Sequence, residues 1–459
     1  MISNFSNEIC ITRLTELSQS RLNGDHDEKK ECIEASRELI NDDNFRSRHR
    51  TSDRYFTRCR KLTFVVMMML LLRKSVKSLQ CVINELFMAL GIESVTAAAF
   101  SRARKHISHT AFIELNEKAV VEVLYRDGNY RRYKRFRVLA VDGSKIRLPE
   151  TEEINKKFGQ IVYTNGQNDE IKGSHTYTQG SVLYDVLNHV ALDAILGQAT
   201  DYEVDLAIQQ LEKTHDDDLI IADRGYASYF FLARLTQAGR AFIVRCSSGS
   251  FKAATAMLAG QGAASQRVTL IAPQTPQELK ALGLPKQLTV RFVRVLLETG
   301  EYEVLVTSLL DEVEYPVSDF KSLYWLRWGV ENFYGVVKTR LQLENFTGRT
   351  VESIKQDFHA TIYITGVESL LTDQAEERLS QKITKHEYHV NKAVAFNAIK
   401  NQVIDLLYHE SDIDCLLEKL TKLFLKNPSC TRKNREVPRR KSSDRVLLNY
   451  HRRLKKICF

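Results

Sequence analysis

The sequence has few of the features that mark membrane, secreted or zinc-binding proteins. Its longest apolar run covers only residues 62–72 and is interrupted by Thr63, whereas a membrane-spanning helix needs about 20 residues. No charged and then apolar leader with a cleavage site opens the chain. None of the eight cysteines stands in C-x-x-C spacing, so neither a zinc site nor a disulfide framework is expected. Scattered free thiols favour a reducing compartment, and we therefore expect a cytoplasmic protein with no membrane partner.

Positive charge is concentrated at one end of the 459-residue chain. The formal net charge is +9, and residues 431–456 hold eleven Lys or Arg residues against two acids, so this tail accounts for the whole excess. The hydrophobic fraction of 43% and the charged fraction of 27% are ordinary for a globular protein. A basic tail on a neutral body indicates a polyanionic partner, and a merely solvated tail is the alternative interpretation.

The first third of the chain and the segment after it differ in pattern. Residues 1–120 show mostly helical spacing, with a buried helix expected over the apolar run 62–72 and another helix from Ser94 to His106. Basic patches mixed with aromatics lie at 46–61 and 100–105. From Tyr133 onward short apolar runs alternate with helical patterns, which predicts an α/β sheet. The expected strands are 136–141, 176–184, 187–196, 219–222 and 241–245, and the expected helices between them are 202–213 and 228–238.

A second, β-rich pattern interrupts this alternation. Two strands are expected at 288–297 and 302–309, and a long helix follows from about Ser318 to Leu341, with further helices after Gly348. The expected organisation has five parts: a helical, DNA-binding region 1–120, the first part of a catalytic core 121–246, a β-rich insertion 247–312, the second part of the core with the long helix 313–380, and a basic helical region 381–459.

Three acids stand where a sheet protein collects functional groups. Asp142 and Asp223 each end an expected strand, and Glu331 lies on the long helix. Side chains at the carboxyl ends of neighbouring strands converge, and carboxylates suit Mg²⁺ or Mn²⁺. Two such ions about 3.5–4 Å apart can activate a water and stabilise the leaving oxygen of a phosphodiester. The alternative for each Asp taken alone is an ordinary turn residue.

The long helix carries a more specific pattern. Tyr324, Arg327, Glu331 and Lys338 stand at offsets of 0, 3, 7 and 14, which places them within roughly 60° of one another on a regular helix. Glu331 would complete the metal site, Arg327 and Lys338 would bind phosphates, and Tyr324 would contact a phosphate or a sugar. The chain's two tryptophans, in the same segment, are interpreted as core residues in preference to base-stacking ones.

These residues carry a family resemblance. The spacing Tyr-x2-Arg-x3-Glu-x6-Lys resembles the YREK signature of bacterial DDE transposases of the insertion sequence four family. Val141-Asp142-Gly143-Ser144 is similar to the first acidic block of that family, and Ala222-Asp223-Arg224-Gly225-Tyr226 is similar to the second. The stretch 100–105 is similar to its N-terminal region, and the resemblance covers most of the chain, although the basic tail has no match.

The resemblance implies a fold and an activity. The fold is an α/β ribonuclease-H-like catalytic core with a β-rich insertion, flanked by helical N-terminal and basic helical C-terminal regions. The activity is metal-dependent DNA cleavage and strand transfer by Asp142, Asp223 and Glu331, which would hold two Mg²⁺ or Mn²⁺ ions. We assign Arg224 to DNA binding together with Tyr324, Arg327 and Lys338.

The same resemblance implies the partners. They are double-stranded DNA, as inverted-repeat ends and as target, and a second copy of the chain in a homodimeric synaptic complex in the bacterial nucleoid. Two other functions stay open at this point: a structure-selective DNA nuclease, and a transposase-derived DNA-binding protein without catalytic activity.

Overall fold

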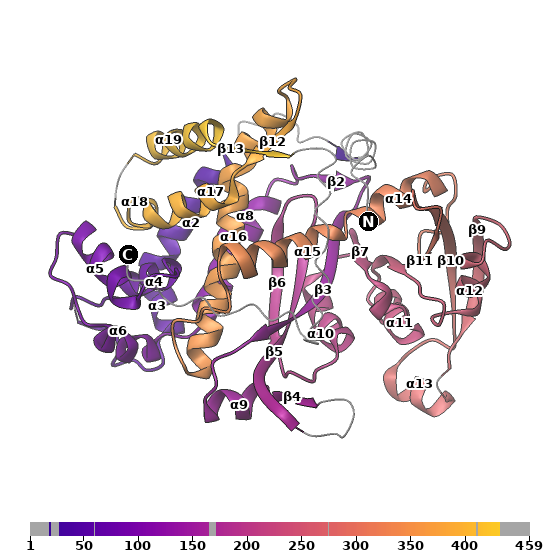
Figure 1. Ribbon diagram of the computed structural model, residues 1–459, viewed down its shortest axis with the longest axis horizontal. Helices are drawn as coiled ribbons and strands as arrows, with labels where there is room; N and C mark the ends of the chain where they lie inside the picture. Colours follow the sequence, from indigo (N-terminus) through magenta and orange to yellow (C-terminus); the bar gives the residue numbers. More distant parts are fainter. Residues whose placement is uncertain are drawn as a thin grey trace.

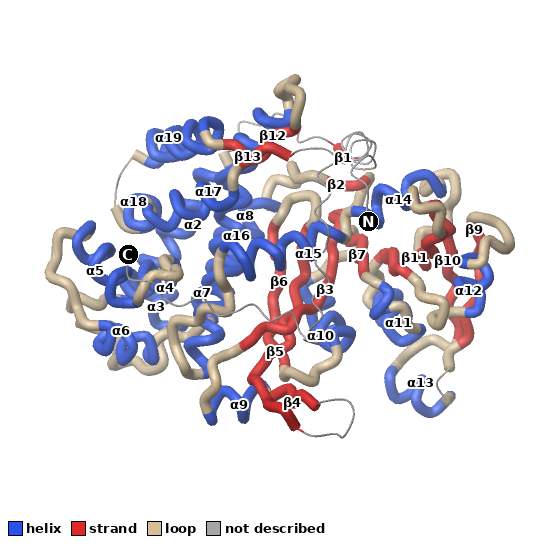
Figure 2. The backbone as a smooth tube through the Cα atoms, viewed as in Figure 1, coloured by secondary structure: helices blue, strands red, loops and turns tan. Residues whose placement is uncertain are grey.

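A mixed β-sheet forms the centre of the molecule. The computed structural model describes residues 18–19, 27–58, 60–164, 171–273, 275–409 and 412–431. Within these ranges nine strands join in one sheet, in the order β4-β5-β3-β7-β8-β11-β10-β9, with β6 on β5. Strands β6, β5, β3 and β7 run between a large group of helices and a smaller lobe, which holds α11, α12 and α13 together with β9, β10 and β11 (Figure 2). The sheet therefore holds the two sides of the molecule together.

Five strands build the part of the sheet that matters for function. They are β3 (Arg137–Arg147), β5 (Ile171–Asp185), β6 (Val190–Gly197), β7 (Asp218–Ala222) and β8 (Ala241–Arg245). β3, β7 and β8 are parallel, whereas β5 is antiparallel to both β3 and β6. The short β4 (Gln160–Thr164) pairs with the first half of β5. The alternating strands and helices expected between residues 136 and 245 are thus confirmed.

Alternation along β3 explains why helices cover both faces of the sheet. Val138 and Ala140 point into one apolar core, while Leu139 and Val141 point into another. α10 (Glu203–Gln210) and α11 (Tyr229–Gln237) pack in the second core. α14 (Val317–Trp325), α15 (Trp328–Gly335) and part of α16 (Val351–Ser380) pack in the first, and α14 and α15 cross the sheet in Figure 1.

Residues 247–312, expected as a β-rich insertion, extend the same sheet. They form α12 (Lys252–Leu258), β9 (Ser265–Ile271), α13 (Pro276–Leu282), β10 (Gln287–Leu296) and β11 (Tyr302–Thr307). β11 pairs antiparallel with β8, so the three added strands lengthen the sheet beyond the end of the parallel part. The two strands expected at 288–297 and 302–309 are confirmed with small shifts of their ends.

The N-terminal and C-terminal helices pack together around α16. The N-terminal group is α2 (Glu28–Asn41), α3 (Asp43–His49), α4 (Phe64–Leu72), α5 (Leu79–Ala89), α6 (Ala97–Ala103), α7 (Thr110–Leu115), the π-helical η2 (Asn116–Val121) and α8 (Glu122–Tyr125). The C-terminal group is α17 (Lys392–Asn401), α18 (Val403–Leu407) and α19 (Ile413–Lys426). Both groups share one apolar core with α16 (Figure 1), and α4 is the buried helix that the apolar run predicted.

Some boundaries differ from expectation. The long helix expected from Ser318 to Leu341 is broken at Leu326 and Arg327, where backbone N–H groups bond three residues back instead of four. Its last turn is a π-helix, η5 (Val336–Arg340). The helix expected from Ser94 begins only after Thr96, whose side chain accepts the capping bond from Ala99. The residues before 27, except 18–19, and the basic tail after 431 lie outside the described residues.

In the ranges that the structure describes, no helix combines the length and the hydropathy needed to cross a bilayer.

Candidate active site

Asp142 and Asp223 lie at the same level of two neighbouring parallel strands. The β3–β7 pairing ends at Ala140 and Ile221. Two residues further along the chain come Asp142, still in β3, and Asp223, directly after the end of β7, so both follow residues that face the same side of the sheet. Asp142 does not end its strand as predicted, because β3 continues to Arg147 by pairing with β5 alone. The two acids therefore lie at the level where the parallel pairing of β3 with β7 ends.

Backbone N–H groups orient both carboxylates. Asp142 Oδ1 accepts a hydrogen bond from Gly143 N at 2.9 Å. Asp223 Oδ1 accepts one from Gly225 N at 2.7 Å, and Asp223 thereby caps the short helix η4 (Arg224–Tyr226). Both aspartates are partly exposed. Each carboxylate is thus held at the edge of the sheet with one oxygen committed to the backbone.

Asp142 is electrostatically unusual. The pKa of Asp142 is raised to about 7, mainly by burial and in smaller part by the negative charges of Asp223 and Glu203. The Gly143 N–H and the Arg327 guanidinium act in the opposite direction. A buried carboxylate with like charges nearby disfavours ionisation unless a cation is present. The site therefore has the electrostatic character of a cation-binding site.

Glu331 lies on α15, which packs on the face of the sheet that carries Asp142. Its Oε1 atom forms an ion pair with Arg327 Nη2 at 2.7 Å. Arg327 is only 4% exposed, and its guanidinium lies 4.8 Å from the centre of the Trp328 ring. Because Arg327 also acts on Asp142, one buried cation serves both acids. Glu331 is thus held by its own helix.

The helix that carries Glu331 is fastened to β3 by two further residues. Tyr334 Oη donates to the Asp142 carbonyl at 3.1 Å and to the Gly180 carbonyl at 3.3 Å. Lys338 Nζ donates to Ser144 Oγ at 2.6 Å and to the Lys145 carbonyl at 2.7 Å. Burial lowers the pKa of Lys338. Lys338 therefore lies beside β3, the strand that carries Asp142, and two of its N–H donors bond to atoms of that strand.

The remaining predicted residues divide between buried and exposed positions. Tyr324 is 4% exposed, and its hydroxyl has no hydrogen-bond partner among the described residues. Arg224 is exposed directly after Asp223. Trp325 and Trp328 are only partly buried, with ring centres 6.3 Å apart, so neither is the core residue that the sequence favoured. Arg224 is thus the predicted cation that already faces solvent.

Several charged and polar neighbours of the site have no counterpart in the sequence prediction. Glu203, at the start of α10, accepts a hydrogen bond from Gln179 Nε2 at 2.9 Å. Arg245 ends β8, next to β7, and its Nε lies 3.0 Å from Glu303 Oε1 on β11. Like Asp223, Arg245 lies at the end of an expected strand, so its place near the site was predictable from the sequence. Glu203 has no comparable signal, because a first-turn acid is common in helices.

The residues fit a divalent cation in chemistry but not yet in arrangement. Carboxylate oxygens are the donors that Mg²⁺ and Mn²⁺ prefer, and the electrostatics of Asp142 favour a bound cation. In the described part of the chain, however, no group of three or more His, Cys, Asp or Glu side chains is placed to hold a metal ion. Asp142, Asp223 and Glu331 thus do not form such a group in this conformation, in which Glu331 is paired with Arg327.

The basic patch at 100–105 is partly structural. Arg104 is 4% exposed and pairs with Asp357 at 3.0 Å. It also donates to Gln356 Oε1 at 3.0 Å on α16. Phe100 is buried as well, whereas Arg102 and Lys105 are exposed. Only those two exposed cations of the patch are available to a partner on the surface.

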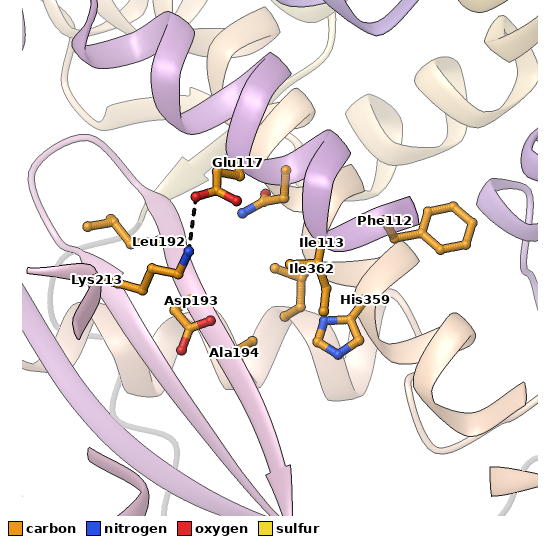
Figure 3. Close-up of a pocket in the computed structure, with 10 residues that line it drawn as sticks. Phe112, Ile113, Glu117, Leu192, Asp193, Ala194, Lys213, His359 and Ile362 are labelled. Atoms are coloured by element: carbon orange, nitrogen blue, oxygen red, sulfur yellow. Dashed lines mark hydrogen bonds and ion pairs between the residues drawn. The ribbon is translucent and has the colours of Figure 1, made fainter. Parts of the chain in front are cut away.

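A small pocket lies away from the acidic edge, between η2, β6 and α16 (Figure 3). Lys213 Nζ and Glu117 Oε1 form an ion pair of 2.9 Å beside it. His359 and Asp193 also line it. None of the predicted site residues takes part, so this pocket and the acidic edge are separate features.

Together, these observations define a mixed α/β protein with acidic side chains at the edge of a parallel strand pair. Residues 133–364 match the family described as "Transposase DDE domain". The chain belongs to this family.

One curated relative is similar over a narrower part of the chain than the family match. The transposase InsG for insertion sequence element IS4 of Escherichia coli (strain K12) is 28% identical over 218 residues, which are 46% of this chain and 46% of that protein. The match therefore spans about half the length of this curated relative. A cryo-EM structure of a piggyBac transposase synaptic complex with hairpin DNA aligns with 87% of this chain and 86% of its own, at a TM-score of 0.42 and 8% identity.

Proposed function

We propose that this chain is a DDE transposase, which cleaves DNA at the ends of an insertion sequence and joins those ends to target DNA. The observation that carries the proposal is the placement of Asp142 and Asp223 at one level of two parallel strands, inside the region that matches the transposase family. The similarity to an insertion-sequence transposase supports the same activity. Phosphodiester cleavage and transesterification are the reactions that such a site would perform.

The topology supports a ribonuclease-H-like core for this activity. In the row β6-β5-β3 each strand is antiparallel to its neighbour, and β7 and β8 follow parallel to β3 through the crossover helices α10 and α11. The proposed division of the chain keeps the core at 121–246 and 313–380, with 247–312 as an insertion that lengthens the sheet. The helical parts at 1–120 and 381–459 would then flank the core.

In the proposed mechanism Asp142, Asp223 and Glu331 would hold divalent ions, Mg²⁺ or Mn²⁺ and two in number. Such ions supply activation of the attacking oxygen and stabilisation of the leaving oxygen. Asp142 would bind the ions in its ionised form. The positive charge of the ions would then offset the negative charge of Asp142, as Arg327 does in this conformation. Glu331 would have to leave Arg327 before it could serve as a ligand, because one carboxylate oxygen is now paired.

The cations near the acids would bind the DNA backbone. Arg224 is exposed beside Asp223 and can bind a phosphate as it stands. Arg327, once released from Glu331, would bind a second phosphate, with Tyr324 and Lys338 contacting the same strand. The partners would be inverted-repeat ends and target DNA, and two copies of the chain would pair the ends in the bacterial nucleoid.

The test is cleavage of a labelled duplex that carries the element's end, with Mg²⁺ present or absent. The natural sequence should cut at the end only with Mg²⁺, and Asp142→Asn, Asp223→Asn and Glu331→Gln should each abolish cutting. Glu212→Gln, which changes an exposed acid on η3 (Leu211–Lys213), is the matched control and should cut normally.

The alternatives predict different results in the same assay. A non-catalytic DNA-binding protein would bind the end and leave it uncut whether or not Mg²⁺ is present. A structure-selective nuclease would cut a branched junction and ignore the linear end. Either outcome would contradict the proposed transposase activity.

A further inference from the structure

The edge of the sheet holds a fourth acid that the family resemblance does not assign. Glu203 lies at the start of α10, on the face of β3 opposite the helix of Glu331. A Cβ atom placed on Gly143 would lie only 2.6 Å from Glu203 Cδ and 2.5 Å from Gln179 Nε2. The Glu203 carboxyl group therefore packs directly against the residue that follows Asp142, in space that only a glycine leaves free.

Glu203 is also within electrostatic range of the second aspartate. Burial raises the pKa of Glu203, and the charge of Asp223 raises it further. Lys145 is the nearest cation that acts on Glu203, yet its ammonium group donates to the Ala199 carbonyl. Three carboxylates thus lie near one short stretch of backbone, and the cations that oppose their charges are Arg327 at Asp142 and Lys145 at Glu203.

Two buried polar atoms beside Glu203 point to a missing ligand. Tyr226 is 1% exposed, its hydroxyl has no partner among the described residues, and Glu203, Asp142 and Asp223 are its nearby charges. Gln179 is fully buried, and its Oε1 atom likewise has no partner in the described ranges. Buried polar atoms without partners are rare and indicate an absent water or ion.

We propose that Glu203, supported by Gln179 and Tyr226, is a fourth acidic residue of the cation site and holds the hydrated side of a divalent ion bound at Asp142 and Asp223. This inference rests on the proposed function, because it places that ion at the same edge. Mg²⁺ usually keeps several of its waters. Those waters would donate to Glu203 and to Gln179 Oε1 and would give the Tyr226 hydroxyl a partner.

The role of Glu203 is that of a positioning residue. An outer contact of this kind requires no group of three direct ligands, which agrees with the absence of such a group from the described residues. Gln179 Nε2 fixes the Glu203 carboxylate, as outer partners do for ligands of other metal sites. Loss of such a partner typically weakens metal binding by about 10–100-fold.

The experiment is a Mn²⁺ titration of the full chain without DNA, in which the electron paramagnetic resonance signal of free Mn²⁺ reports binding. We expect Glu203→Gln to weaken Mn²⁺ binding at least about tenfold. Tyr226→Phe, which removes only the unpartnered hydroxyl, should weaken it by a smaller but measurable factor. Glu212→Gln at the other end of the same helical segment should bind as the natural sequence does.

Each outcome decides a different question. If Asp142→Asn and Asp223→Asn weaken binding but Glu203→Gln does not, the role of Glu203 is overturned and the proposed function stands. If none of the three changes binding, the metal site of the proposed function itself fails. If Glu203→Gln does not fold, as judged by circular dichroism in EDTA, Tyr226→Phe decides, and an unchanged Mn²⁺ affinity in that variant overturns the inference.

Discussion

Neutralising Asp142 should stabilise the metal-free protein in a pH-dependent way. Asp142→Asn keeps a side-chain oxygen that can accept the Gly143 N–H bond but removes a carboxylate whose ionisation the fold disfavours. Burial raises the pKa of Asp142 from the ordinary 3.8 to about 7. Between these two pH values the unfolded chain has lost the proton while the folded chain still holds it, so stability falls as pH rises.

The magnitude follows from the two pKa values. One pH unit corresponds to 1.36 kcal/mol, so the penalty reaches at most about 4 kcal/mol above pH 7 and is absent below the unfolded pKa. Between pH 5 and pH 8 the natural sequence should therefore lose about 3 kcal/mol of unfolding free energy from this residue alone. Asp142→Asn has no charge to lose and should escape this loss.

The assay is denaturant unfolding in EDTA at pH 5 and at pH 8, followed by circular dichroism. The difference in unfolding free energy between Asp142→Asn and the natural sequence should grow by about 3 kcal/mol from the lower to the higher pH. Glu212→Gln should show no such growth. Added Mg²⁺ should offset the penalty in the natural sequence only, because the ion binds the ionised carboxylate.

Parallel pH profiles for Asp142→Asn and the natural sequence would refute this reasoning. They would mean that solvent or Arg327 compensates the charge of Asp142 completely. A larger gap at pH 5 than at pH 8 would refute it more directly, since that sign belongs to a carboxylate whose pKa is lowered by folding.

Four further outcomes are expected. Asp223→Asn should abolish end cleavage while end binding persists in a gel-shift assay, and residual cleavage near the normal rate would count against a catalytic role. Arg224→Ala and Arg327→Ala should each lower the slope of log affinity against log salt by roughly 0.9. An unchanged slope for Arg327→Ala would mean that Arg327 binds no phosphate and only pairs with Glu331. Asp357→Ala should destabilise the fold by about 3–5 kcal/mol, because its arginine partner stays buried; a loss below 1 kcal/mol in denaturant unfolding would contradict this. Deleting residues 431–459 should weaken binding to end and scrambled duplexes equally, and a selective loss for ends would mean that the tail, and not the helical region 1–120, recognises the ends.

The sequence predicted the local elements of the core because their signals are local. The short apolar runs of β7 and β8 and the helical spacing between them depend on side chains within about ten residues. The apolar run of α4 predicted a buried helix for the same reason. Element type could thus be predicted wherever one stretch of chain decides it.

Other features depend on contacts that no local pattern records. β3 extends past Asp142 because β5 pairs with it as far as Arg147, and β5 is distant in the sequence. The helix break at Arg327 and the π-helical turn at Lys338 occur in the segment that packs against β3. Glu203 can pack against β3 next to Asp142 only because Gly143 has no side chain. Such features require the folded arrangement.

The anchoring of α15 limits how the candidate site can change when a metal binds. Tyr334 bonds to the carbonyl of Asp142 itself, and Lys338 bonds to Ser144 and Lys145 of the same strand. A shift of the helix would break these bonds and leave buried donors unpaired, which costs free energy. The Arg327–Glu331 ion pair is the weaker constraint, because its Glu331 side chain is 40% exposed and Arg327 keeps the charge of Asp142 nearby when the pair opens. Opening that pair, with the helix in place, is therefore the least costly route by which Glu331 can approach the two aspartates, and it would free Arg327 for a phosphate in the same movement.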